Sequence, residues 1–178
     1  MTSTRLWRHP LALAPRDLRP WLAARGSLTA RLMAHFPEIR VSVLRQGWDQ
    51  PHGDEIAIMQ LPRGGTQVAV REVILASRGT PLVYAHSITA RSALARGFHL
   101  LGRTGSRPLG ALLFADPTIR RSPLAWRCID ARHPLYQSAR AAVGPLPPRL
   151  WARRSLFHSG RDVLLVTEVF LPALANAS

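Results

Sequence analysis

The stretch that decides the fold is Leu164-Leu165-Val166-Thr167-Glu168-Val169-Phe170-Leu171-Pro172. Its apolar, β-branched composition predicts a buried strand, yet it carries a carboxylate, Glu168, at its centre. A second apolar stretch, residues 68–75, carries a guanidinium, Arg71, in the same kind of setting. Burying an unpaired charge costs several kcal/mol, so such residues are either paired or used. Two such placements in one small domain predict a polar pocket within a β-sheet core.

Side chains alternate along a strand, and the alternation places both charges on apolar faces. Arg71 shares a face with Val73, and Glu168 shares one with Val166, whereas Glu72 points to the side opposite Arg71. From the residues alone, an ion pair between Arg71 and Glu168, or between Arg71 and Glu72, is the main alternative to a functional pocket.

The flanking segments supply the rest of a small α+β domain. Period-two patterns predict further strands at 39–44, 66–77, 82–89, 119–129 and 151–158. Caps and helical periodicity predict helices at 17–25, 28–36, 90–101, 109–114 and 133–143. Hairpin-like turns favour a single antiparallel β-sheet of about six strands with flanking helices. We expect residues 1–14 to form a flexible N-terminal arm and residues 15–178 to form one domain.

Charge and composition narrow the classes of function. The 178 residues carry 24 basic and 10 acidic side chains, a net charge of +14, and every basic residue is an arginine. The arginines are scattered, which disfavours a nucleic-acid surface while still attracting small anions. The single cysteine, Cys128, excludes an intramolecular disulfide and fits a reducing compartment. No apolar run reaches the roughly 20 residues of a membrane span, so we expect a soluble, cytoplasmic protein.

Common signatures of cofactor and metal chemistry are absent from the sequence. It has no glycine-rich phosphate loop, no Cys/His cluster with zinc-ligand spacing and no Gly-x-Ser-x-Gly elbow. The histidines are dispersed, and a lone histidine within a strand, such as His86, is more often a satisfied core residue than a catalyst. The sequence therefore predicts a site without metal, nucleotide or acyl-enzyme chemistry.

Six segments, in order along the chain, together resemble the chorismate lyase family. They are GSLTARL (26–32), LRQGW (44–48), RE (71–72), RPLGALLF (107–114), WARRS (151–155) and TEVFLPA (167–173). The resemblance implies cleavage of chorismate to 4-hydroxybenzoate and pyruvate, which opens the synthesis of the ubiquinone head group. It also implies a cytoplasmic α+β monomer without cofactor or metal. Residues 15–178 would be the catalytic domain, with a closed internal cavity that retains the product.

The resemblance also assigns site residues. The arginine that binds the ring carboxylate falls on Arg71, and the acidic residue that faces the product hydroxyl falls on Glu168. Two main-chain contacts fall on Leu28 and Leu109. Both leucines lie in the first turns of predicted helices, where amides lack internal partners and suit an anion.

The chemistry of chorismate explains these residue types. The substrate is a dianion with a ring carboxylate, an enolpyruvyl ether and a neighbouring hydroxyl. Arginine offers a planar fork that grips a carboxylate by two parallel hydrogen bonds and stays charged when buried. A protonated Glu168 would donate to the leaving ether oxygen, whereas an ionised Glu168 would accept the ring hydroxyl or the ring proton. The sequence leaves both roles open.

Two other classes of function compete with a lyase. The first is a non-catalytic effector-sensing domain that binds a 4-hydroxybenzoate-like ligand, as in transcription regulators of related fold. Against it, the chain has no room for a separate DNA-reading helix-turn-helix. The second is a nucleic-acid binder that works through its arginine excess, which the scattered arginines disfavour.

Overall fold

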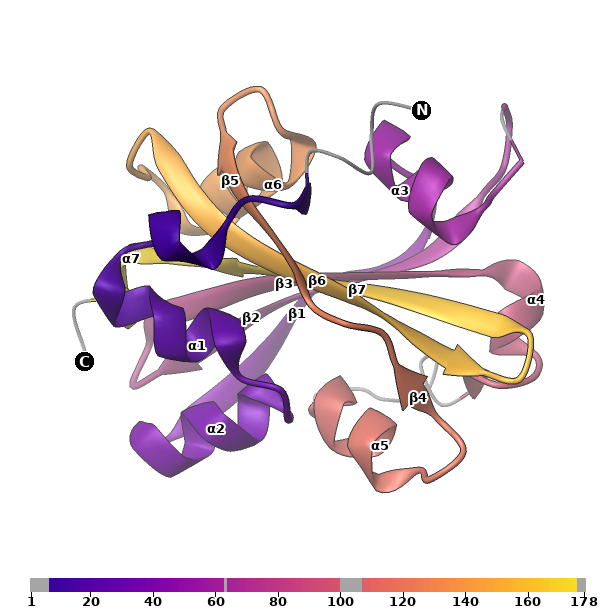
Figure 1. The fold of residues 1–178 in the computed structure, drawn as a ribbon, viewed down its shortest axis with the longest axis horizontal. Coiled ribbons are helices and arrows are strands. Elements are labelled where there is room, and N and C mark those ends of the chain that lie inside the picture. Colours follow the sequence, from indigo (N-terminus) through magenta and orange to yellow (C-terminus); the bar gives the residue numbers. More distant parts are fainter. Residues whose placement is uncertain (1–6, 63, 100–106, 176–178) are drawn as a thin grey trace.

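The computed structural model describes residues 7–62, 64–99 and 107–175. Within them, seven strands form one antiparallel sheet in the order β1-β2-β3-β7-β6-β4, and β5 also pairs with β6 (Figure 1). The strands are β1 (Ile39–Asp49), β2 (Val68–Ser77), β3 (Thr80–Ala90), β4 (Arg120–Arg121), β5 (Ala125–Asp130), β6 (Arg149–Ser159) and β7 (Asp162–Phe170). The predicted fold class is confirmed, with seven strands instead of about six.

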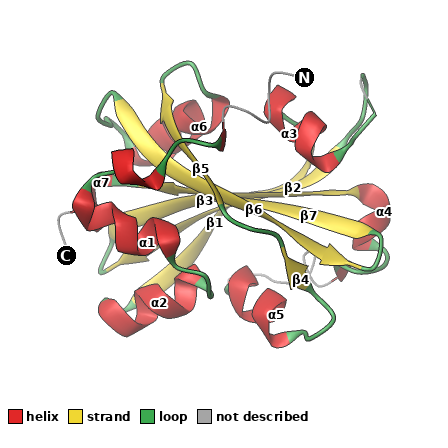
Figure 2. Cartoon of the chain, viewed as in Figure 1, coloured by secondary structure: helices red, strands yellow, loops and turns green. Residues whose placement is uncertain are grey.

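Helices lie on both sides of the sheet (Figures 1 and 2). They are α1 (Arg19–Ala23), α2 (Leu28–His35), α3 (Gly53–Met59), α4 (Arg91–Leu94), α5 (Leu109–Ala115), α6 (Pro134–Val143) and α7 (Pro172–Ala175), with 3-10 turns at Leu11–Leu13 and Arg16–Leu18. In Figure 1, α2 and α5 lie below the sheet, and α3 and α6 lie above it. No helix of the described residues is long and apolar enough to cross a membrane.

Each face of the sheet has its own core because side chains alternate along every strand. On what we call the front face, α1 and α2 pack through residues such as Leu22 and Leu32 onto Val73 and Leu75 of β2. On the back face, two clusters form. One joins α6 to β2, β3 and β7, and the other joins Met59 of α3 to β2, β3 and β7. The pocket described below lies on the front face.

The predicted strand at 119–129 is wrong, because the chain breaks it into β4 and β5 on either side of Pro123. Proline has no amide hydrogen to donate to a ladder, so it disrupts regular pairing. Ser122 bridges the break by donating its amide to the Leu156 carbonyl at 2.8 Å and accepting the Leu156 amide on its hydroxyl at 2.9 Å. Both short strands still pair with β6.

The predicted helix at 90–101 is also wrong, because α4 ends at Leu94. The Gly97 amide donates to Asp162 at 3.1 Å and is therefore drawn out of the helical pattern. A Cβ on Gly97 would lie 2.8 Å from the side chain of Ser159, so this close approach requires glycine. Residues 100 and 101 of that prediction lie outside the described residues, as do residues 102–106, for which the glycine and serine content predicts a loop.

Residues 7–14 pack onto the domain, unlike the flexible arm expected for residues 1–14; residues 1–6 are outside the description. Trp7 is 2% exposed and belongs to the back-face core. Its indole nitrogen donates to Asp54 at 2.5 Å, and the guanidinium of Arg154 lies 4.2 Å from its ring centroid. The burial of the Trp7 ring, its hydrogen bond to Asp54 and the Arg154 cation over its face together hold this segment against the domain.

A buried ionic cluster occupies the back face around His86, which is 3% exposed. Its Nδ1 lies 3.1 Å from Glu72, and its Nε2 lies 3.1 Å from Glu55 of α3. The ring of His52 stacks on it with centroids 5.2 Å apart. Burial alone would lower the pKa of His86, but the two glutamates outweigh burial and raise that pKa to about 9. His86 is thus a buried core residue in contact with two carboxylates.

The free energy of unfolding should therefore fall as the pH rises from about 6.5 to about 9. Below 6.5, His86 is protonated in both states, and its contacts with the two glutamates contribute fully. Above 6.5 the unfolded chain loses this proton first, so the contribution disappears as the pH passes the folded pKa of about 9. The shift corresponds to a contribution on the order of 3 kcal/mol. The measurement is urea unfolding across this range.

Matched variants make this prediction specific to one residue. His86→Gln should flatten the decline, whereas His35→Gln, at an exposed position of α2, should keep it. A second decline is expected at acidic pH, because the pKa values of Glu55 and Glu72 are lowered by their contacts with histidine, despite the opposing effect of burial. An identical decline in wild type and His86→Gln would contradict the assignment.

Candidate active site

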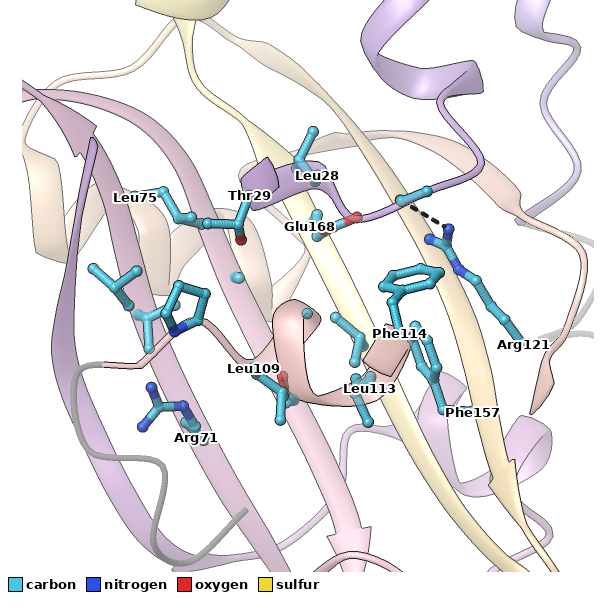
Figure 3. A pocket seen from close by; sticks show the side chains of 18 residues that line it. Leu28, Thr29, Arg71, Leu75, Leu109, Leu113, Phe114, Arg121, Phe157 and Glu168 are labelled. Carbon is cyan, nitrogen blue, oxygen red and sulfur yellow. Dashed lines mark hydrogen bonds between the residues drawn. The ribbon is translucent and has the colours of Figure 1, made fainter. Parts of the chain in front are cut away.

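A pocket on the front face lies between the sheet and the starts of α2 and α5 (Figure 3). All four predicted site residues, Leu28, Arg71, Leu109 and Glu168, line it. They come from four separate elements, α2, β2, α5 and β7, which the fold brings together. The remaining lining is mostly apolar and comes from Gly26, Thr29, Val41, Val73, Leu75, Ala85, Ser87, Pro108, Gly110, Leu113, Phe114, Arg121, Phe157 and Val166.

Arg71 marks one end of this pocket and is 2% exposed. Its Nη1 donates to the Gln46 side chain at 3.0 Å, and its Nη2 donates to the Arg107 carbonyl at 3.4 Å. Burial lowers the pKa of Arg71, because water no longer solvates the charge. The two carbonyl-type acceptors thus orient the guanidinium at the edge of the pocket, where a planar fork of donors suits a carboxylate.

A β-bulge in β1 places Gln46 beside Arg71. The register of β1 against β2 shifts between Val43 and Arg45, so Gln46 pairs with Arg71. An extra residue in one strand reverses the alternation beyond it and sends the following side chains to the other face. The sequence prediction ended this strand at residue 44 and therefore missed Gln46 as a neighbour of the site.

Glu168 lies farther along the pocket, between Arg71 and Arg121 in the view of Figure 3. Its Oε2 accepts a hydrogen bond from Arg153 Nε at 2.5 Å. The Arg153 side chain is 0% exposed, against 15% for Glu168. The ion pair considered between Arg71 and Glu168 is thus replaced by Arg153–Glu168, and Glu72 pairs with His86 on the back face.

Sequence reasoning missed Arg153, although a signal was present. The Ser159–Asp162 hairpin fixes the register of β6 against β7, and counting back from that turn pairs Arg153 with Glu168. Arg153 also donates from Nη1 to the carbonyls of Trp21 at 2.8 Å and Ala24 at 2.7 Å. It therefore ties the end of α1 to the carboxylate in the pocket.

The starts of α2 and α5 meet at the mouth of the pocket. Ser27 caps α2 by accepting the Ala30 amide at 3.2 Å, and Pro108 precedes α5. A Cβ on Gly110 would lie only 2.9 Å from the Ser27 hydroxyl, so glycine permits the close approach of the two helices. The first-turn positions Leu28 and Leu109 lie where backbone amides have no intrahelical acceptor.

Arg121 of β4 is a second cation in the lining that sequence reasoning missed. Its Nε donates to Ser155 at 2.7 Å, and its Nη1 donates to the Arg25 carbonyl at 2.7 Å. Its guanidinium lies 5.5 Å from the ring centroid of Phe114 and 5.4 Å from that of Phe157. Burial lowers the pKa of Arg121, with a smaller opposing effect of the Glu168 charge.

One group among the described residues has the donor types and spacing of a metal site. The ligand atoms of His52, Glu55 and His86 lie within 4.8 Å of one another. They lie on the back face, opposite the pocket, because His86 and Glu55 belong to the ionic cluster. The pairing of His86 with both Glu55 and Glu72 accounts for this group as a structural network.

Fold and site together define a class: a small α+β protein with a largely apolar pocket that has an arginine on either side and a paired carboxylate between them. Residues 1–177 match the chorismate lyase family. This chain belongs to the chorismate lyase family.

Relatives of similar length support this membership. A protein of Aromatoleum aromaticum named probable chorismate pyruvate-lyase is 48% identical over 176 residues, which cover 97% of this chain and 94% of that protein. A protein of Thiobacillus denitrificans with the same name is 45% identical over 168 residues, covering 94% of this chain and 89% of the relative.

Solved structures show a fold shared with a different class of protein. The PhnF C-terminal domain aligns with a TM-score of 0.58 at 16% identity, covering 84% of this chain and 92% of that one. The effector domain of PhnF from Mycobacterium smegmatis aligns with a TM-score of 0.57 at 12% identity, covering 84% and 91%. At such identities the likeness concerns the fold alone. The family match therefore favours a lyase over the sensor alternative.

Proposed function

We propose that this protein cleaves chorismate to 4-hydroxybenzoate and pyruvate, the entry step to the ubiquinone head group. The observation that carries the proposal is the convergence of Leu28, Arg71, Leu109 and Glu168 on one pocket in a chain of the chorismate lyase family. The protein acts without cofactor or metal. Loss of the enolpyruvyl group makes the chorismate ring aromatic, and this aromatisation drives the reaction.

In the proposed complex, the ring carboxylate lies at the Arg71 end of the pocket. Arg71 grips it with its planar fork, and the first-turn amide of Leu109 adds a hydrogen bond. Leu28, which lies beside Glu168 in Figure 3, contacts the opposite end of the ring through its own first-turn amide. The ring rests on apolar side chains from β2 and α5, such as Val73 and Leu113. This mode fixes the ring in one orientation, and correct orientation of the reacting groups supplies a large part of a catalysed rate.

In this orientation, the ring hydroxyl and the carbon that bears it lie next to Glu168. The reaction breaks the bond between the ring and the ether oxygen, and the hydroxyl-bearing carbon loses its proton. As the anionic partner of Arg153, Glu168 accepts the hydroxyl hydrogen bond and the ring proton. The enolpyruvate that leaves takes up a proton and becomes pyruvate, so atoms and charges balance.

The test is purified protein with chorismate and a chelator. The expected result is the formation of equal amounts of 4-hydroxybenzoate and pyruvate, which chromatography measures. Tight binding of 4-hydroxybenzoate without turnover would instead identify a sensor domain, and salt-sensitive DNA binding without either would identify a nucleic-acid binder. We also propose a cytoplasmic monomer, which light scattering during gel filtration and cell fractionation would test.

A further inference from the structure

We propose that Arg121 binds the second carboxylate of the substrate, the one on the enolpyruvyl arm. This inference rests on the proposed function and adds a residue that recognises substrate and not product. Chorismate carries two carboxylates, whereas 4-hydroxybenzoate carries one. A pocket that distinguishes them needs a second cation on the side of the leaving group.

The position of Arg121 matches the geometry of chorismate. The enolpyruvyl ether is attached to the ring carbon next to the one that bears the hydroxyl, so it lies at the Glu168 end. Figure 3 shows Arg121 on that side of the pocket, with Arg71 at the opposite end. Both arginines line the pocket, so each carboxylate of the dianion has its own cation.

Existing contacts hold the Arg121 guanidinium in place before any ligand arrives. Ser155 and the Arg25 carbonyl accept its Nε and Nη1, and the rings of Phe114 and Phe157 flank it. Its Nη2 has no hydrogen bond to the described residues, so a donor remains for an anion. A cation fixed in this way loses little side-chain entropy when it binds, which favours affinity.

Arg153, the other guanidinium near Glu168, does not offer this contact. Its side chain is 0% exposed, and it is held by Glu168 and by the carbonyls at the end of α1. It also does not line the pocket. Arg153 is therefore a positioning residue for Glu168, and Arg121 is the cation that reaches the ligand.

The test compares ligands that differ in the second carboxylate. The probes are 3-(carboxymethoxy)-4-hydroxybenzoate, an aromatic stand-in for the substrate, and 3-methoxy-4-hydroxybenzoate, which lacks that carboxylate. Arg121→Gln should lower the affinity for the dicarboxylate by roughly 10- to 100-fold and change the affinity for the monocarboxylate by less than about threefold. The KM for chorismate should rise in parallel. Arg120→Gln, an exposed neighbour in β4, is the matched control and should behave as wild type.

The outcomes separate this inference from its alternatives. Equally reduced affinity for both probes would show that Arg121 only holds the backbone of Arg25 and Gly26 ahead of α2. Unchanged affinity for both would show that Arg121 makes no contact with the ligand. Either result overturns the proposal. A wild-type protein that binds the probes as expected but leaves chorismate intact would refute the proposed function instead, because the binding measurement needs no turnover.

Discussion

Glu168→Gln is expected to lower kcat for chorismate by roughly 10²- to 10⁴-fold, the usual range for loss of a general acid or base. The amide has nearly the shape of the carboxylate but takes up no proton. It can still accept the hydrogen bond from Arg153, so the side chain should stay in place. Affinity for 4-hydroxybenzoate should change far less than kcat, which assigns the loss to the chemical step.

The choice of glutamine matters, because alanine would leave Arg153 buried without a partner. Removing one member of a buried ion pair destabilises a protein by about 3–5 kcal/mol, which would confuse lost folding with lost catalysis. Glu38→Gln is the control, since Glu38 is an exposed partner of Arg78 at the far end of the sheet. A Glu168→Gln protein that turns over at nearly the wild-type rate would remove Glu168 from the mechanism.

Arg71→Gln is expected to raise both the KM for chorismate and the Kd for 4-hydroxybenzoate by roughly 30- to 1,000-fold. The range follows from a loss of about 2–4 kcal/mol when a buried, hydrogen-bonded charge partner is removed. Both ligands carry the ring carboxylate, so both should lose affinity, in contrast to the selective effect expected at Arg121. Glutamine retains polarity at a site that is 2% exposed, which limits damage to folding.

Arg40→Gln provides the comparison for Arg71, because Arg40 is exposed on β1 and its loss removes the same unit of charge. Isothermal calorimetry with 4-hydroxybenzoate and steady-state kinetics with chorismate give the two constants. If Arg71→Gln bound the product as tightly as Arg40→Gln does, the carboxylate would have to lie elsewhere in the pocket.

Much of the site could be predicted because it depends on strand alternation. Alternation alone put Arg71 and Glu168 on core faces, and the structure brings both to one pocket. Their partners depend on features that alternation does not show. Gln46 reaches Arg71 through a β-bulge, and Arg153 reaches Glu168 through the register of a hairpin. Arg121 lies on a two-residue strand that was predicted as part of a longer one.

The errors in secondary structure have two causes, one local and one long-range. The segment after β3 has a helical pattern, yet a tertiary hydrogen bond from Gly97 to Asp162 ends the helix early. The segment after α5 has a strand pattern, yet one proline divides it. The buried position of Trp7 likewise depends on Asp54 and Arg154, which are far away in sequence. Local propensity is a weak prior when such long-range contacts compete with it.

Substitutions in the back-face core and substitutions in the pocket should be harmful for different reasons. Variants around His86 or Trp7 would reduce the amount of folded protein in a cell, since steady-state abundance follows stability. Polar substitutions that keep the shape of the pocket, such as Arg71→Gln and Glu168→Gln, would instead leave the amount of protein nearly unchanged and reduce the activity of each molecule. A survey that scores abundance and growth separately would therefore distinguish substitutions that impair folding from those that impair the pocket.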